Sequence, residues 1–232
     1  MLLLAAMSML LAASAGADIY VEKASKAIGN TGGDGAQEWV TRMWISENRI
    51  RVEEPEGNMI NITDFNDRTL TTLDTENKEY FVISLDQVQQ DFIRNTALLK
   101  NRINMNWRVE TVQDGGEIVG YPTQLIRFHG LGTMAANNEQ KELRITMSIW
   151  VSDQVPGLTA VSDRMLEVMG LDKYPFIGAE VLAEIKRLGG FHLKANVESE
   201  MDGKVQGVEQ VVLLLEEIEN DPSRYEVPAG FE

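Results

Sequence analysis

Residues 48–84 read NRIRVEEPEGNMINITDFNDRTLTTLDTENKEYFVIS, and this stretch carries the clearest strand signal of the sequence. It contains four short runs in which apolar and polar residues alternate with the period of two that is typical of a β-strand. The runs are NRIRVEE, MINITDF, RTLTTLD and KEYFVIS, and they are divided by PEGN, NDR and TENK, which favour turns. Because such short connections join neighbouring antiparallel strands, the stretch predicts a β-meander.

The same period continues on both sides of the meander. The clearest case is KELRITMSIWVS (141–152), where Leu143, Ile145, Met147, Ile149 and Val151 fall on one face and mostly polar residues on the other. Such a strand has one buried and one solvated face. Further strands are predicted at ADIYVEKASKAI (17–28), QEWVTRMWIS (37–46), WRVETVQ (107–113), GEIVGYPTQLIRFHG (116–130), FHLKANVES (191–199) and KVQGVEQVVLLLEEIE (204–219), the last two joined by a turn at Asp202-Gly203.

Three segments break the strand period and predict helices. In SLDQVQQDFIRNTALLKNRI (84–103), Ser84 and Gln87 have the spacing of a capping box. SDRMLEVMG (162–170) has Ser162 as its expected cap and Gly170 as its stop. PFIGAEVLAEIKRLGG (175–190) places apolar side chains on one stripe, namely Ile177, Val181, Leu182, Ile185 and Leu188.

These patterns predict an α+β fold, with roughly ten or more strands in one antiparallel sheet and about three helices. A long sheet with one apolar face must curl around its helices or leave that face exposed. We therefore expect a curled sheet, an incomplete barrel whose concave face is covered by the helices. The period of the sequence leaves open whether that interior is packed solid or holds a cavity for an apolar ligand.

Residues 1–17, MLLLAAMSMLLAASAGA, are uncharged and apolar and end in small residues, which predicts a cleaved signal peptide. A retained membrane anchor is the alternative, although the run falls short of the roughly 20 apolar residues that a span needs. The expected mature chain, residues 18–232, is a single domain. Since the sequence has no cysteine, it can hold no disulfide and no lipidated thiol, and a bacterial periplasm is the expected compartment.

Charge and composition argue against several classes of function. Acidic residues outnumber basic ones by 36 to 21, giving a net charge of −15, which disfavours nucleic-acid binding. The chain has two histidines far apart and no G-x-S-x-G sequence, so neither a metal site, a cofactor nor serine–histidine catalysis is expected. His192 is expected on the polar face of its strand, beside Lys194 and Asn196. A hydrolase that uses a pair of carboxylates remains an alternative.

Several segments together resemble an uncharacterised exported bacterial family that is similar in fold to the outer-membrane lipoprotein carriers, the LolA-like half-barrel. They are ADIYVEK, MWISENRIRVE, ITDFNDRTLTTLDTENKEYFVI, GEIVGYPTQLIRF, IWVSDQVPG and the terminal YEVPAGFE, and they run from Asp18 to Glu232. The resemblance implies acyl chains held on the concave face under helices. It also implies that the closing segment, with Pro228, Gly230 and Phe231, locks the end of the chain against the sheet.

Together, architecture and resemblance give the expected function: an exported, non-enzymatic periplasmic protein that binds a lipid or the acyl chain of a lipoprotein. The expected ligand-lining residues are Leu143, Ile145, Met147 and Ile149 on the strand and Val181, Ile185 and Leu188 on the covering helix. The alternative is an envelope protein whose barrel is packed solid and which acts by contacting a protein partner.

A cationic stretch gives one more candidate site. The sequence from residue 94 to residue 108 contains no acid and four basic residues, namely Arg94, Lys100, Arg102 and Arg108. One interpretation is that these cations complement the dipole at the end of a helix. The other is that they form a docking point near the barrel rim for an anionic headgroup or an acidic partner.

Overall fold

The computed structural model describes residues 17–29, 38–97, 102–136, 139–170 and 178–232. Eleven of its strands form one antiparallel sheet in the order β6-β5-β4-β3-β2-β1-β13-β12-β11-β10-β7. These strands are β1 (Asp18–Gly29), β2 (Glu38–Ile45), β3 (Arg49–Glu53), β4 (Met59–Asp64), β5 (Thr69–Asp74), β6 (Glu79–Ser84), β7 (Ile103–Val112), β10 (Gln124–Ala136), β11 (Glu139–Ser152), β12 (Phe191–Met201) and β13 (Lys204–Ile218). Two short strands, β8 (Glu117–Ile118) and β9 (Tyr121–Pro122), form a separate hairpin.

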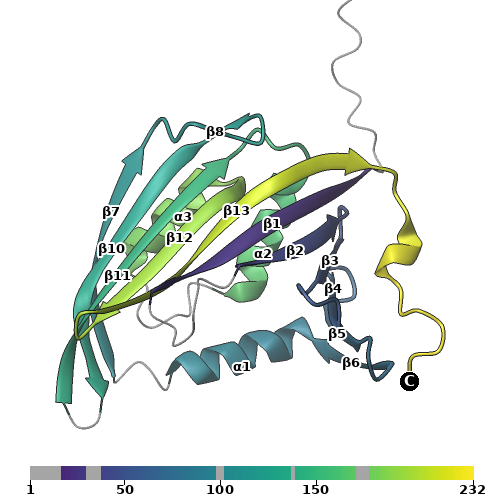
Figure 1. Cartoon of the computed structure of the whole chain (residues 1–232), viewed down its shortest axis with the longest axis horizontal. Helices are drawn as coiled ribbons and strands as arrows, with labels where there is room; N and C mark the ends of the chain where they lie inside the picture. The colour runs from purple at the N-terminus through teal and green to yellow at the C-terminus, as the bar shows by residue number, and fades with distance from the viewer. Residues whose placement is uncertain (1–16, 30–37, 98–101, 137–138, 171–177) are drawn as a thin grey trace, which may run out of the picture.

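The large sheet is strongly curled (Figure 1), and it does not close, because its end strands β6 and β7 do not pair with each other. The meander predicted from residues 48–84 is confirmed, since β3, β4, β5 and β6 pair in sequence order. The turn at Asp202-Gly203 is confirmed as well: both residues have positive φ, and Met201 pairs with Lys204 across it. The predicted class, a curled antiparallel sheet with helices, is therefore the observed one.

The α-helices among the described residues are α1 (Leu85–Ala97), α2 (Leu158–Met169) and α3 (Ala179–Leu188). Helices α2 and α3 lie inside the curve of the sheet, whereas α1 runs across its open side (Figure 1). Because α1 joins β6 to β7, the chain passes from one edge of the sheet to the other at this point. Most of α1 is not buried; Leu85 and Thr96 are its buried residues.

The helix signals in the sequence were correct for two ends and wrong for two, one of which is the predicted extension of the first helix to Ile103, where β7 begins instead. Ser84 caps α1 as predicted, its Oγ accepting a hydrogen bond from the Gln87 N–H at 3.1 Å. Gly170 ends α2 in a left-handed conformation with φ 58°. The predicted start at Ser162 is wrong, since α2 begins at Leu158. Gly157, with φ 72°, turns the chain there so that the buried Leu158 enters the core.

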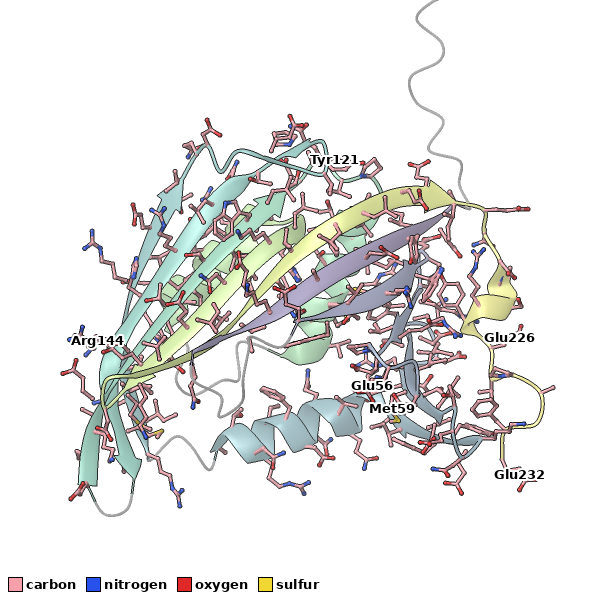
Figure 2. The ribbon with its side chains drawn as sticks, viewed as in Figure 1. Glu56, Met59, Tyr121, Arg144, Glu226 and Glu232 are labelled. Carbon is pink, nitrogen blue, oxygen red and sulfur yellow. The ribbon has the colours of Figure 1, made fainter. Side chains whose placement is uncertain are left out.

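The C-terminal segment packs against the convex face of the sheet. Tyr225, which is 7% exposed, forms a cluster with Ile60 and Ile62 of β4 and Leu73 of β5, and Phe231 packs against the same cluster. The segment then reaches the edge strand β6, beside which Figure 2 labels Glu232. The Glu232 N–H donates to the Lys78 carbonyl at 2.9 Å, and the Tyr80 N–H donates to the Glu232 carbonyl at 3.0 Å. This end of the chain is therefore held by both apolar packing and backbone pairing.

Candidate functional site

The concave face of the sheet is the candidate site, and strand register identifies its residues. Phe128 of β10 lies opposite both Met147 of β11 and Val109 of β7, so these three side chains share a face. Val181 and Ile185 of α3 pack against the same cluster, which makes this face the concave one. Phe128 has no exposed surface and Val181 is 1% exposed, so α3 covers this part of the face closely.

The sheet and α3 bring four of the predicted ligand-lining residues together. Met147, Ile149, Val181 and Ile185 belong to one apolar cluster, where they pack against one another and against Phe128. Leu143 and Ile145 lie further along the same face of β11, since side chains two residues apart share a face. The Leu188 side chain lies outside the described part of the structure. The expected juxtaposition of strand and helix is thus present, and the side chains of α3 pack directly on those of β11.

A polar contact at the edge of this cluster helps to hold α3 on the sheet. Glu184 of α3 accepts a hydrogen bond from the Thr111 hydroxyl on β7. Its two carboxylate oxygens also accept from Arg187, at 2.8 Å from Nε and 2.6 Å from a terminal nitrogen. These bonds lower the pKa of Glu184 to about 2, and the bond from Arg187 has a larger effect than the bond from Thr111.

Replacing Glu184 by glutamine is expected to lower the free energy of unfolding by about 1 kcal/mol at pH 7, because Arg187 is exposed and solvent screens the pair. A carboxylate whose pKa falls on folding stabilises the fold above its ordinary pKa of 4.5 and loses that contribution as the pH falls towards about 2. Urea unfolding at pH 7 and pH 2.5 measures both values. An equal difference between wild type and variant at the two pH values would contradict this role.

Beyond α3, the concave face continues as a surface that we call the open apolar strip. It consists of partly exposed side chains on the strand segments that no described helix packs against: Ile103 and Met105 of β7, Ile145 of β11, and Val197 and Met201 of β12. Glycines on β10 shape this wall. A Cβ added at Gly130 would lie 2.5 Å from the Met105 Cε and 2.8 Å from the Trp107 ring, so these two side chains lie across β10.

One charged group on the concave face is absent from the predicted site. Lys23 of β1 is 9% exposed, and its Nζ lies 3.3 Å from Nε2 of His192 on β12. The signal was available in the alternation of β1, because Ile19, Val21 and Lys23 have the same parity and the first two are core residues. A charged residue in phase with the core was therefore readable from the sequence.

The prediction that His192 shares a face with Lys194 and Asn196 is wrong. A bulge shifts the register between β11 and β12, so that Trp150 pairs with Lys194 but Val151 pairs with His192, and Leu193 is the extra residue. The bulge reverses the alternation and turns the imidazole towards Lys23. His192 keeps exposed surface there and stacks on Phe191 with ring centroids 5.4 Å apart.

Burial lowers the pKa of Lys23 to about 8. The contacts of the ammonium include no carboxylate of the described residues that would offset this effect. None of the ion pairs formed among the described residues includes Lys23; its neighbours are the His192 ring and the Phe191 ring, whose centroid is 5.9 Å from Nζ. The protein surrounding His192, and then the Lys23 ammonium, lower the pKa of that imidazole as well. A neutral His192 can accept the hydrogen bond that the ammonium donates.

The predicted cationic set does not gather at one point of the described structure. Arg94 is exposed on α1 and pairs with Asp91. Arg108 is exposed in the middle of β7, on the parity opposite to the concave Met105 and Trp107, and therefore lies on the convex side of the sheet. Arg102 is exposed in the turn that precedes β7. Lys100 lies outside the described residues.

Small pockets lie elsewhere in the described part of the structure. Three pockets of about 200, 240 and 280 Å³ lie at turns and strand ends away from the open apolar strip, and polar residues line most of each. Within the described ranges, no three His, Asp or Glu side chains gather as a metal ion would require. No described helix is long and apolar enough to cross a bilayer.

Comparison with family models finds no match for this sequence, and neither does comparison with curated proteins. Among solved structures, the chain is similar to the crystal structure of a LolA superfamily protein from Nitrosomonas europaea. The two share 9% sequence identity and have a TM-score of 0.31, and the match covers 89% of this chain and 88% of that one. Similarity of this size adds nothing on function, and the fold rests on the strand order and register described above.

Proposed function

We propose that this protein is an exported, non-enzymatic binding protein of the periplasm that holds a lipid or a protein-bound acyl chain on the concave face of its sheet. The observation that carries the proposal is the open apolar strip. Its side chains are apolar and partly exposed on the inner side of a curved sheet, where a fold without a ligand would gain stability by burying them. Methionine and isoleucine there suit flexible chains of varied shape.

The covering helix supports the same function. α3 has ten residues and rests on the sheet through one apolar stripe, with Glu184 as its polar anchor to β7. A short helix held in this way can shift outward at modest cost, which would enlarge the apolar surface around Met147 and Ile149. The predicted lining residues on β11 and α3 then bound the ligand from below and above.

Replacing Ile145 by aspartate is expected to weaken binding of a fluorescent fatty acid by about tenfold or more, because it places a charge in the open apolar strip. The measurement is a fluorescence titration with cis-parinaric acid, followed by displacement with palmitate. Ile145 is only partly buried, so the variant should still fold, which circular dichroism verifies.

The matched control is Ser148→Asp on the same strand. Ser148 has the opposite parity and pairs with Arg127, which gives the new carboxylate a cationic neighbour on the convex face. This variant is expected to bind the probe as the wild type does. Equal affinities for wild type, Ile145→Asp and Ser148→Asp would place the probe elsewhere and contradict the proposed site.

The cationic residues Arg94, Arg102 and Arg108, with Lys100, form a separate part of the proposal, as a contact for an acidic envelope partner or an anionic membrane surface. The support is the exposure of the three arginines and the lack of acids in the sequence between Arg94 and Arg108. Reversing the charges of Arg102 and Arg108 together tests it. An unchanged affinity for anionic vesicles and for any captured envelope partner would remove this contact from the account.

A further inference from the structure

Lys23 is an unusual residue for the place that it occupies. Its side chain is 91% buried in the middle of the concave face, yet no carboxylate of the described residues forms an ion pair with it. A buried ammonium without a counter-ion is unfavourable, and folded proteins usually pair such a group or exclude it. The described part of the chain therefore supplies no counter-ion for the Lys23 ammonium.

Two irregularities of the sheet lie beside Lys23 and its neighbour. In the pairing of β1 with β13, Glu22 lies opposite Leu214 but Lys23 lies opposite Val212, so Leu213 of β13 is an extra residue, while Lys23 keeps the alternation of β1. The second bulge, at Leu193, turns His192 towards Lys23. Bulges re-aim side chains and are frequent beside functional sites. Both bulges lie next to this ammonium.

Two further groups that can donate hydrogen bonds lie on the same face as the ammonium. Ser25 has the parity of Lys23 on β1 and is 2% exposed. Its Oγ accepts a hydrogen bond from Nε2 of Gln210 at 3.2 Å, which leaves the hydroxyl hydrogen free to donate to a further acceptor. Because His192 is exposed, a ligand can reach its imidazole from solvent. The Lys23 ammonium, the Ser25 hydroxyl and the Nδ1–H that His192 keeps when its Nε2 accepts from Lys23 are donors for a carboxylate.

We propose that Lys23, Ser25 and His192 form a binding site for the carboxylate of a free fatty acid, whose chain lies along the open apolar strip. One ammonium matches the single negative charge of a carboxylate, whereas a phosphate dianion would leave an uncompensated charge in a buried place. The nearest residue of the strip, Val197 on β12, is level with Ala27, two strands away and four residues along β1 from Lys23, which places its Cα ~16 Å from that of Lys23. This assignment names the ligand class of the proposed function and rests on it.

The test compares ligands that share a chain and differ in the headgroup. Isothermal titration of the full mature protein with palmitate, hexadecanol and hexadecyl phosphate is made for wild type, Lys23→Met and Lys26→Met. Lys26 is an exposed lysine of the same strand, paired with Glu38 at 3.1 Å, and serves as the matched control. We expect the wild type and Lys26→Met to prefer palmitate over hexadecanol by about tenfold or more, and Lys23→Met to lose that preference while still binding hexadecanol.

Each other outcome has a definite meaning. Equal affinity of the wild type for palmitate and hexadecanol would overturn the carboxylate site and leave the proposed function in place. Tighter binding of hexadecyl phosphate than of palmitate would overturn the choice of a carboxylate in favour of a phosphate headgroup. If Lys23→Met keeps the preference, the site is not at Lys23. If none of the three ligands binds the wild type, both the site and the proposed function fail.

Discussion

Deletion of residues 225–232 is expected to lower the free energy of unfolding by about 4 kcal/mol or more, because it removes Tyr225 from its buried place on the sheet. Truncation of a buried aromatic residue to alanine costs about 3–5 kcal/mol, and the deletion also removes Phe231 and the backbone pairing of Glu232 with β6. For a domain of this size, the melting temperature should fall by about 8–16 °C. Differential scanning calorimetry measures both quantities.

Two point variants separate the packing of the tail from its length. Tyr225→Ala should reproduce most of the loss, since Tyr225 is 7% exposed and contacts Ile60, Ile62 and Leu73. Glu226→Ala, at the exposed next residue, should change the melting temperature by less than about 2 °C. An unchanged melting temperature on deletion of residues 225–232 would show that the closing segment does not stabilise the fold.

Replacing Lys23 by methionine is expected to raise the free energy of unfolding of the ligand-free protein, whereas deletion of the closing segment lowers it. Burial lowers the pKa of Lys23 from its ordinary value of 10.5 to about 8, a difference that corresponds to about 3 kcal/mol against the charged form. Methionine has a similar length and no charge, so it should recover most of this amount at pH 7. Urea unfolding measures the difference from wild type, with Lys26→Met as the unchanged control.

The pH dependence gives this prediction a second readout. Below pH 8, Lys23 is protonated in both the folded and the unfolded chain, so the whole cost is present. Between pH 8 and 10.5 the unfolded chain binds more protons than the folded one, and the stability of the wild type therefore rises. The advantage of Lys23→Met should shrink across that interval. A less stable variant at pH 7 would mean that the ammonium has a favourable partner and would contradict the account of an unpaired charge.

Much of the fold could be predicted from the sequence because its signals are local. The strands of the meander and the turn at Asp202-Gly203 follow from alternation and turn chemistry, and Ser84 with Gln87 marks the start of α1. The same alternation on β11 identified which side chains face α3. Each of these features depends on residues close in sequence, and the structure keeps the local preference.

The polar part of the site could not be predicted because it depends on pairing between distant strands. The orientation of His192 is set by one extra residue, Leu193, which reverses the alternation on which the prediction relied. The start of α2 depends on the turn at Gly157 and on burial of Leu158 against β1 and β12, and Ser162 alone gives no sign of either. Lys23 was readable as a charge in phase with the core, but its proximity to His192 required the register of the sheet.

Native mass spectrometry shows whether the protein carries a ligand. The protein is expressed as the full chain, purified from the periplasm and examined under native conditions, and organic extraction identifies whatever leaves with it. We expect an adduct with the mass of a fatty acid or another acyl lipid, which added palmitate displaces and which Ile145→Asp does not retain. A clean ligand-free mass, with no change in melting temperature when palmitate is added, would contradict a binding function and favour a solidly packed protein that acts through a protein partner.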